Sequence, residues 1–292
     1  MQDKTSEKLN FVFWGTPDVA SDNLEILKQN GYMPSFIVTS PDKPQGRKML
    51  ITPPPVKFWA EKNNIPYIQP EKLDEELHSR LKALSCNLFI VVAYGKIIPE
   101  NILNMPKFGS INIHYSLLPK YRGASPVESA ILNGDTETGV TIQKIVYKMD
   151  AGPIIVTEKI NILPEETAPE LRKQLIKIGG DLLVKILNTP TAYGTSPYIG
   201  GGWEGIIQDE SQATYCKKIK KEDGLIDING DAVKNYNKFR AYAVWPRTFF
   251  FKNNKRIIIT DAVLLNSQLV IKKVLPEGKK EIKYEDFLKA NT

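Results

Sequence analysis

Apolar residues in the first part of the chain occur in short runs that predict strands, with amphipathic stretches between them. Runs at 9–14, 35–39 and 109–114 have the length of ordinary strands. The run at 87–93, NLFIVVA, is apolar almost throughout, which is typical of a central parallel strand covered on both faces. Because strand, helix and strand follow one another between residues 9 and 39, the sequence predicts a parallel βαβ unit.

Helix starts are predicted from residues that favour helix ends. Thr16 is expected to cap the first helix, with Pro17 at its first position and Gly31 after its end. Ser125 and Glu128 have the spacing of a capping box. A long helix is predicted from a second capping box and from an apolar stripe that we expect to be core; these residues are Thr167, Glu170, Leu171, Leu175, Ile178, Leu182 and Ile186.

Two segments connect these elements in a way that bears on function. The stretch 40–57 contains five prolines and a basic tip. A loop of this length inside a compact domain is usually functional or disordered. Further along, strands at 139–146 and 154–160 are expected to flank a tight turn at 149–153.

The composition changes after residue 187. Residues 188–208 are rich in Gly, Pro, Ser and Thr, which favours a linker. A helix at about 231–243 and several short β runs follow, the pattern of a small antiparallel barrel. We therefore predict an α/β fold with a mostly parallel sheet domain at 1–187, a linker at 188–208 and a small β-barrel domain at 209–292.

The bulk composition is that of a soluble globular protein. The 292 residues are 42% apolar and 25% charged, and no apolar run approaches the ~20 residues needed to span a bilayer. The first ten residues are polar and mixed in charge, which does not fit a secretory signal. We expect a cytoplasmic protein that does not contact a membrane.

Cysteine and histidine are too scarce for a structural metal site. Cys86 and Cys216 are far apart and lack metal-ligand spacing, so we expect two free thiols. The chain has only two histidines, His78 and His114, and no cysteine cluster. These observations argue against structural zinc, and we expect no metal ion.

Positive charge is concentrated near the C-terminal end. Residues 210–292 contain 17 Lys and Arg against 10 Asp and Glu, a net charge of +7. Residues 1–209 contain 22 against 23, a net charge of −1. One interpretation is a lysine-rich soluble surface. The other is a module that binds a polyanion, with nucleic acid as the best candidate.

Candidate chemistry is concentrated in the strand at 109–114. Asn112 and His114 are two positions apart, so they project from one face near the carboxyl end, where open α/β sheets bind ligands. Asp150 follows the next long strand, and we expect it in the same crevice. An Asn amide and a protonated His can hold an oxyanion, and an Asp would favour the imidazolium and orient its ring.

The same residues also have ordinary structural interpretations. A single histidine near an apolar strand is more often structural, and an Asp beside a Gly is most often part of a surface turn. Ser116 lies near His114, but no second histidine is placed to serve as its base. The absence of a nucleophile elbow argues against an acyl-enzyme and favours direct transfer between two bound substrates.

Longer motifs around these residues resemble a known family. NIHYSLLPKYRGASP, residues 112–126, resembles the signature of the 10-formyltetrahydrofolate-dependent formyltransferases, and MDAGPI, residues 149–154, resembles the turn that carries their catalytic aspartate. PDKPQGR, residues 41–47, and KIKKEDG, residues 218–224, are similar to the methionyl-tRNA formyltransferase family in particular. The resemblance extends over nearly the whole chain.

The resemblance implies a fold and a reaction. It implies a Rossmann-like catalytic domain followed by an OB-like barrel that contacts tRNA. The formyl group of 10-formyltetrahydrofolate would pass to the α-amino group of methionine on initiator tRNA, a step of translation initiation, and we expect a monomer to do this. The cosubstrate would bind near Ser116, Leu117, Leu118 and Pro119.

The resemblance also implies roles for individual residues. Asn112 and His114 would polarise the formyl oxygen, and Asp150 would keep His114 charged and help to accept the proton that the amine loses. Arg47 would probe the top of the acceptor stem. The residues expected to bind tRNA are Arg47, Lys48, Lys217, Lys218, Lys220 and Lys221.

Three alternatives are weighed against this interpretation. The same chemistry could act on a small amine, as in a nucleotide-sugar N-formyltransferase; the basic C-terminal region and the Arg47 loop argue against it. An RNA-binding module without catalysis would not need Asn112, His114 and Asp150. A nicotinamide-dependent dehydrogenase is disfavoured because the strand at 9–14 is followed by a single GTP turn rather than by GxGxxG.

Overall fold

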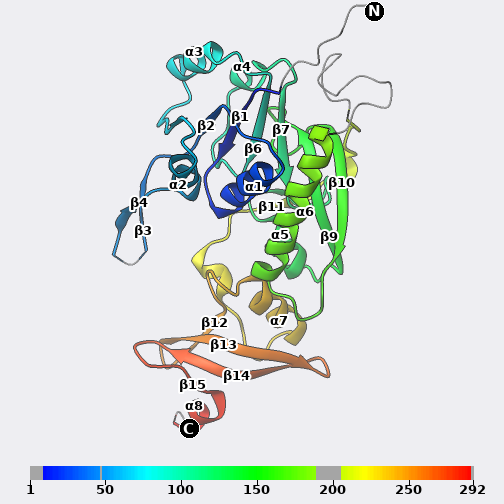
Figure 1. The fold of residues 1–292 in the computed structure, drawn as a ribbon. Helices are drawn as coiled ribbons and strands as arrows, with labels where there is room; N and C mark the ends of the chain where they lie inside the picture. The colour runs from blue at the N-terminus through cyan, green and yellow to red at the C-terminus, as the bar shows by residue number, and fades with distance from the viewer. Residues whose placement is uncertain (1–8, 47, 189–204, 291–292) are drawn as a thin grey trace, which may run out of the picture. The chain divides into compact units, whose positions relative to one another are not determined.

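A computed structural model of the chain describes residues 9–46, 48–188 and 205–290. Within these residues the chain forms two compact units, each built from segments that are distant in sequence (Figure 1). The first unit contains the described residues of 1–119, 140–158 and 175–213, and the second those of 120–139, 159–174 and 214–292.

A seven-stranded sheet organises the first unit. Its strands are Phe11–Gly15 (β1), Phe36–Val38 (β2), Tyr67–Ile68 (β5), Leu88–Val92 (β6), Ser110–His114 (β7), Glu137–Lys144 (β9) and Ile154–Asn161 (β10). They lie in the order β10-β9-β7-β6-β1-β2-β5. The pairs from β7 across to β5 are all parallel, whereas β9 is antiparallel to β7. The predicted βαβ unit and the mostly parallel sheet are confirmed.

Helices cover both faces of this sheet. All five residues of β6, in the middle of the sheet, are buried, which explains the continuous apolar run. On one face Phe89 and Val91 pack with Leu77 of α3 (Glu75–Ala83). On the other face α6 (Ala168–Asn188) approaches β7 so closely that a Cβ on Gly179 would lie 3.1 Å from the Ile113 side chain.

The first helix, α1 (Asp18–Gln29), starts one residue later than predicted. Its N-cap position is Pro17 rather than Thr16. The Thr16 hydroxyl donates a hydrogen bond to the Tyr94 carbonyl at 3.0 Å and lies 3.0 Å from the Ser40 hydroxyl. The cap prediction was wrong because Thr16 follows β1 directly, and its hydroxyl joins the segments that leave the neighbouring strands.

The two predicted capping boxes have different outcomes. Ser125 precedes α5 (Pro126–Leu132) without making a side-chain cap, and Glu128 pairs with Arg172 instead, so that prediction was wrong. At α6 the Glu170 carboxylate accepts the Thr167 backbone N–H at 2.9 Å, as a capping box requires. Most of the predicted apolar stripe of α6 is core: Leu171, Leu175, Leu182 and Ile186 are buried, whereas Ile178 is only partly buried.

The proline-rich stretch 40–57 contains a hairpin that the sequence pattern did not predict. Lys43–Gln45 (β3) pairs with Leu50–Thr52 (β4) in antiparallel register, and α2 (Pro55–Lys62) follows. Lys48 is exposed close to the hairpin turn. Arg47 lies outside the described residues, so its predicted contact with tRNA stays a prediction.

The C-terminal part of the second unit is a four-stranded antiparallel sheet, in agreement with the small barrel that the sequence predicts. Its strands are Phe249–Lys252 (β12), Lys255–Leu265 (β13), Gln268–Pro276 (β14) and Ile282–Lys283 (β15). Two of the short β runs that follow the predicted helix form one strand, β13, with register shifts between Ile259 and Ala262. A bulge explains why the alternation breaks there.

A buried arginine anchors α7 (Ala232–Ala241) inside the second unit. Arg240 donates hydrogen bonds to the carbonyls of Leu163 and Glu166 and to the Asn237 side chain. These bonds, made by the two terminal nitrogens, offset part of the cost of burying the charge. The remaining elements are α4 (Glu100–Leu103), β8 (Arg122–Gly123), β11 (Tyr215–Cys216) and α8 (Tyr284–Lys289).

The predicted domain boundaries remain a prediction, because residues 189–204 of the expected linker at 188–208 lie outside the described residues. Both cysteines, Cys86 and Cys216, are free, as predicted. In the described parts of the chain, no helix has the length and apolar character that a membrane span needs.

Candidate active site

Four polar side chains share one face of the sheet where β7 and β9 pair. The register sets Asn112 opposite Gln143 and His114 opposite Thr141. Because side chains two positions apart lie on one face of a strand and directly opposed residues lie on the same face of a sheet, these four project together. Asn112 and His114 thus lie on one face of β7, as the alternation of side chains along a strand predicts.

Asp150 reaches this face through a loop that folds back. As predicted, it follows the next long strand, β9, but β9 is antiparallel to β7, so its carboxyl end points away from His114. The loop after β9 folds back instead. A Cβ on Gly152 would lie 1.8 Å from the Lys144 carbonyl oxygen, so only glycine allows this close return.

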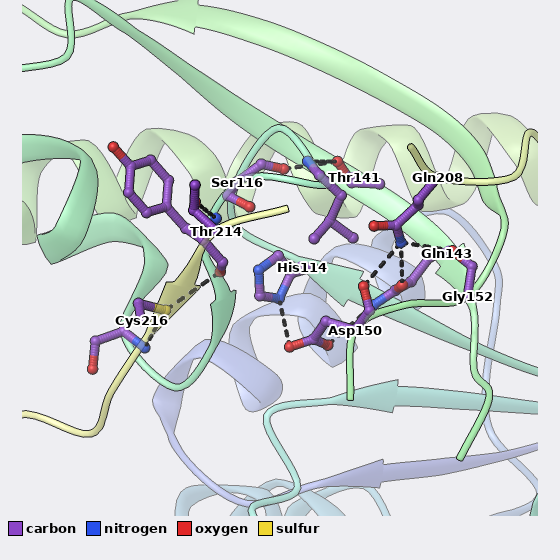
Figure 2. A network of polar contacts seen from close by, with 12 residues as sticks. His114, Ser116, Thr141, Gln143, Asp150, Gly152, Gln208, Thr214 and Cys216 are labelled. Atoms are coloured by element: carbon purple, nitrogen blue, oxygen red, sulfur yellow. Dashed lines mark hydrogen bonds and ion pairs between the residues drawn. The ribbon is translucent and has the colours of Figure 1, made fainter. Parts of the chain in front are cut away.

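His114 and Asp150 come together, as Figure 2 shows, and Asn112 lies on the same face of β7 as His114. The Asp150 Oδ2 atom lies 3.6 Å from His114 Nδ1. His114 is 5% exposed and Asn112 is partly exposed, so the imidazole is largely removed from water while the site stays open. In this setting the carboxylate can orient the ring.

Two glutamines that the sequence did not single out hold the Asp150 loop (Figure 2). Gln143 Nε2 donates to Asp150 Oδ1 at 3.0 Å. Gln208 Nε2 donates to the carbonyl oxygens of Asp150 at 2.9 Å and Gly152 at 2.7 Å. Gln143 could have been suspected from its strand alternation, but Gln208 follows Asp150 by 58 residues and carries no local signal.

The side-chain amide of Asn112 is available to a ligand. Among the described residues this side chain makes no hydrogen bond, and it is not fully buried. Its N–H donor and the His114 ring project from the same face, two positions apart on β7. Two such donors can hold an oxygen on which negative charge develops.

No activated nucleophile stands out in the described part of the first unit. Burial raises the pKa of the Cys86 thiol to about 11, so it stays protonated near neutral pH. Burial also raises the pKa of Tyr94 to about 12, which excludes it as a base at neutral pH. Direct transfer without a covalent intermediate stays a prediction.

Comparison with known proteins shows where this chain belongs. The family described as "Formyl transferase" matches residues 8–187, and "Formyl transferase, C-terminal domain" matches residues 218–269. A methionyl-tRNA formyltransferase of Thermotoga maritima is 41% identical over 260 residues, covering 89% of this chain and 80% of the relative. Another, of Staphylococcus epidermidis, is 36% identical over 303 residues, covering 95% and 94%. The chain belongs to the methionyl-tRNA formyltransferase family.

Solved structures confirm the fold of this formyltransferase. A methionyl-tRNA formyltransferase from Clostridium thermocellum matches with a TM-score of 0.62 at 18% identity and covers 94% of this chain and all of its own. An N-formyltransferase from Helicobacter canadensis, in complex with folinic acid and dTDP-3-aminofucose, matches with a TM-score of 0.65 at 20% identity, covering 91% and 94%. The Rossmann-like fold predicted from the family resemblance is thereby confirmed.

In this formyltransferase the segment predicted to bind folate is held against β9. The Thr141 hydroxyl donates to the Ser116 carbonyl at 2.7 Å and accepts the Leu118 backbone N–H at 3.2 Å (Figure 2). Ser116 and Leu118 are buried, whereas Leu117 and Pro119 are partly exposed. One side of this turn is therefore packed and the other is open.

The lysines predicted to bind tRNA lie at the surface of the second unit. The side chains of Lys217, Lys218, Lys220 and Lys221 are all exposed, within and before the short 3₁₀ turn Lys221–Gly224. Lys220 has an acidic neighbour, Glu222, with an Nζ to Oε1 distance of 3.9 Å. Among the residues that the structure describes, no group of three His, Cys, Asp or Glu side chains is placed to hold a metal ion.

Proposed function

We propose that this enzyme transfers the formyl group of 10-formyltetrahydrofolate to the α-amino group of methionyl initiator tRNA. The observation that carries the proposal is the meeting of Asn112, His114 and Asp150 on one face of the sheet, in a chain whose relatives named methionyl-tRNA formyltransferase match nearly its whole length. Because every proposed group comes from one chain, we propose that it acts as a monomer, in the cytoplasm.

The first task of the site is to stabilise charge. Attack of the amine nitrogen on the formyl carbon moves negative charge onto the formyl oxygen. The Asn112 amide N–H and the protonated His114 ring are the two donors that we assign to that oxygen. Both Asn112 and His114 belong to strand β7, so the two donors are held in place before the substrate arrives. Donors that are already in place make such stabilisation effective.

The second task is to move a proton. The amine must lose a proton when its new C–N bond forms, and the folate nitrogen must gain one when its bond to the formyl carbon breaks. We assign the acceptance of the amine proton to Asp150, whose Oδ2 lies 3.6 Å from His114, and the protonated carboxyl group then gives this proton to the folate nitrogen. The same carboxylate keeps the ring oriented while the charge moves.

The residues assigned to the formyl donor are those of the turn from Ser116 to Pro119. The folate cosubstrate supplies the formyl group when it is bound. Ser116 to Pro119 offers one packed and one open side, next to the open amide of Asn112. Folinic acid, a folate, is bound in the Helicobacter canadensis relative. This supports a folate as the formyl donor.

Contacts to tRNA are assigned to basic residues of two segments. Lys217, Lys218, Lys220 and Lys221 are exposed and lie in the region with a net charge of +7. The second segment contains Lys48 and Arg47, which are adjacent in sequence. Contacts of this kind position an RNA through its phosphates, while recognition of the initiator comes from its unpaired end and shape.

The substrate is tested by a panel of amines offered with 10-formyltetrahydrofolate. We expect formylmethionine to form on methionyl initiator tRNA, with methionyl elongator tRNA much slower and a dTDP-linked amino sugar unreactive. The product is measured after release from the tRNA. Formylation of the amino sugar with no reaction on either tRNA would replace the proposal with a nucleotide-sugar N-formyltransferase.

A further inference from the structure

A buried glutamine amide lies directly behind the Asp150 loop and contacts two of its carbonyl oxygens and the Gln143 side chain. Gln208 is 5% exposed, and its Nε2 lies 2.9 Å from the Asp150 carbonyl, 2.7 Å from the Gly152 carbonyl and 3.3 Å from Gln143 Oε1. We propose that Gln208 and Gln143 are positioning residues that fix the Asp150 carboxylate against His114. The proposal rests on the proposed function, because Asp150 is assigned its role there.

The segment that carries Gln208 is attached to the loop by its backbone. Ile206 and Ile154 exchange two backbone hydrogen bonds, both 2.8 Å, next to the start of β10. A Cβ on Gly205 would lie 2.8 Å from Pro153 Cβ, so this segment packs directly on the residues after the loop. Gln208 is therefore fixed in place by contacts that do not depend on its own side chain.

The two glutamine amides form a directional chain to the carboxylate. Gln208 presents an NH₂ group to Gln143 Oε1, which leaves the Gln143 NH₂ group facing Asp150 Oδ1 at 3.0 Å. One carboxylate oxygen is thus held by Gln143, and the other, Oδ2, is left for His114. The direction of the Gln143 amide is set at both ends, since the reversed amide would place two NH₂ groups together at Gln208 and two oxygens together at Asp150.

The backbone of the loop needs this support. Asp150 has a left-handed conformation, with φ of +50°, which costs free energy in a residue other than glycine. Its neighbours Tyr147 and Met149 are 69% and 58% exposed, so they contribute little packing to hold the turn. The two carbonyls that Gln208 binds bracket the turn at Asp150 and Gly152.

Kinetics test whether Gln208 acts through Asp150. Gln208→Leu should lower kcat by about 10- to 100-fold with little change in KM for either substrate, because a small displacement of a reacting group is that costly. Gln143→Met, which keeps the length and removes the donor, should do the same. The matched control is Gln212→Leu, at an exposed glutamine of the same segment, and it should be neutral. A rise in KM with unchanged kcat would overturn the proposal.

A double-mutant cycle separates positioning from general damage. In an Asp150→Asn background, Gln208→Leu should cause almost no further loss of rate, because the group that it positions is already gone. Losses that multiply would show that Gln208 acts independently of Asp150 and would overturn the proposal.

A readout that needs no substrate keeps this test separate from the proposed function. The chain has only two histidines, His78 and His114, so ring signals of protein labelled with ¹⁵N-histidine can be assigned with one His78→Gln variant. Gln208→Leu and Gln143→Met should shift the His114 ring signals and leave those of His78 in place. Unchanged His114 signals in both variants would refute the positioning role, even in an enzyme that formylates tRNA. Shifted signals in a protein inactive on tRNA would support it and refute only the proposed function.

Discussion

Replacing His114 by alanine should lower the rate of formyl transfer by about 10²–10³-fold, the loss that follows removal of one donor to a developing oxyanion. The ring is 5% exposed and faces Asp150 at 3.6 Å, so its removal takes away both a donor and the partner of the carboxylate. Folate binding should be largely retained, because the turn at Ser116–Pro119 is held by Thr141. Steady-state rates and folate titration measure the two effects.

The matched control for this variant is the second histidine. His78→Ala removes a partly exposed ring on α3, whose neighbour is Glu75, and it should leave transfer unchanged. A His114→Ala enzyme with nearly wild-type turnover would remove His114 from the mechanism. Loss of folate binding in parallel with rate would instead assign the residue to the donor site.

Binding of tRNA should weaken steeply as salt rises. If Lys217, Lys218, Lys220 and Lys221 each contact a phosphate, the affinity should fall roughly 10²-fold between about 50 and 200 mM salt, because each contact releases counterions. Replacing all four by alanine should flatten the slope of log affinity against log salt by about three. Filter binding or fluorescence titration at several salt concentrations measures the slope.

An equally charged control distinguishes local contacts from net charge. Lys28, Lys62, Lys82 and Lys177 are exposed lysines of the first unit, and replacing these four changes net charge by the same amount. This control variant should retain most of the wild-type slope of log affinity against log salt. A flat salt profile in the unaltered enzyme, or equal flattening by both sets, would contradict the role of the lysines at 217–221.

Strands were predicted more reliably than helix ends. The continuous apolar run of β6 reports burial on both faces, a property that the residues carry themselves. The cap of α1 depends on what else is near Thr16, and there the Tyr94 carbonyl and the Ser40 hydroxyl compete with the helix N-terminus for its hydroxyl. A pattern of single residues does not contain such a competition.

In the candidate site, too, some features follow from the local sequence and others depend on the fold. The shared face of Asn112 and His114 follows from strand alternation alone. The approach of Asp150 depends on the direction of β9 and on the close return at Gly152, neither of which the local sequence determines. The position of Gln208 is even harder to predict from the sequence, because the backbone bridge between Ile154 and Ile206 brings it to the loop.

The most direct measurement is the single-turnover rate of formyl transfer to methionyl initiator tRNA, with wild-type enzyme in excess and with the Asp150→Asn variant beside it. This substitution keeps the size of the side chain and removes its charge and its capacity to take a proton. Rapid product formation by the wild type, slowed by at least about 10²-fold in the variant, is the predicted result. Equal rates, or no formylmethionine from the wild type, would contradict the account.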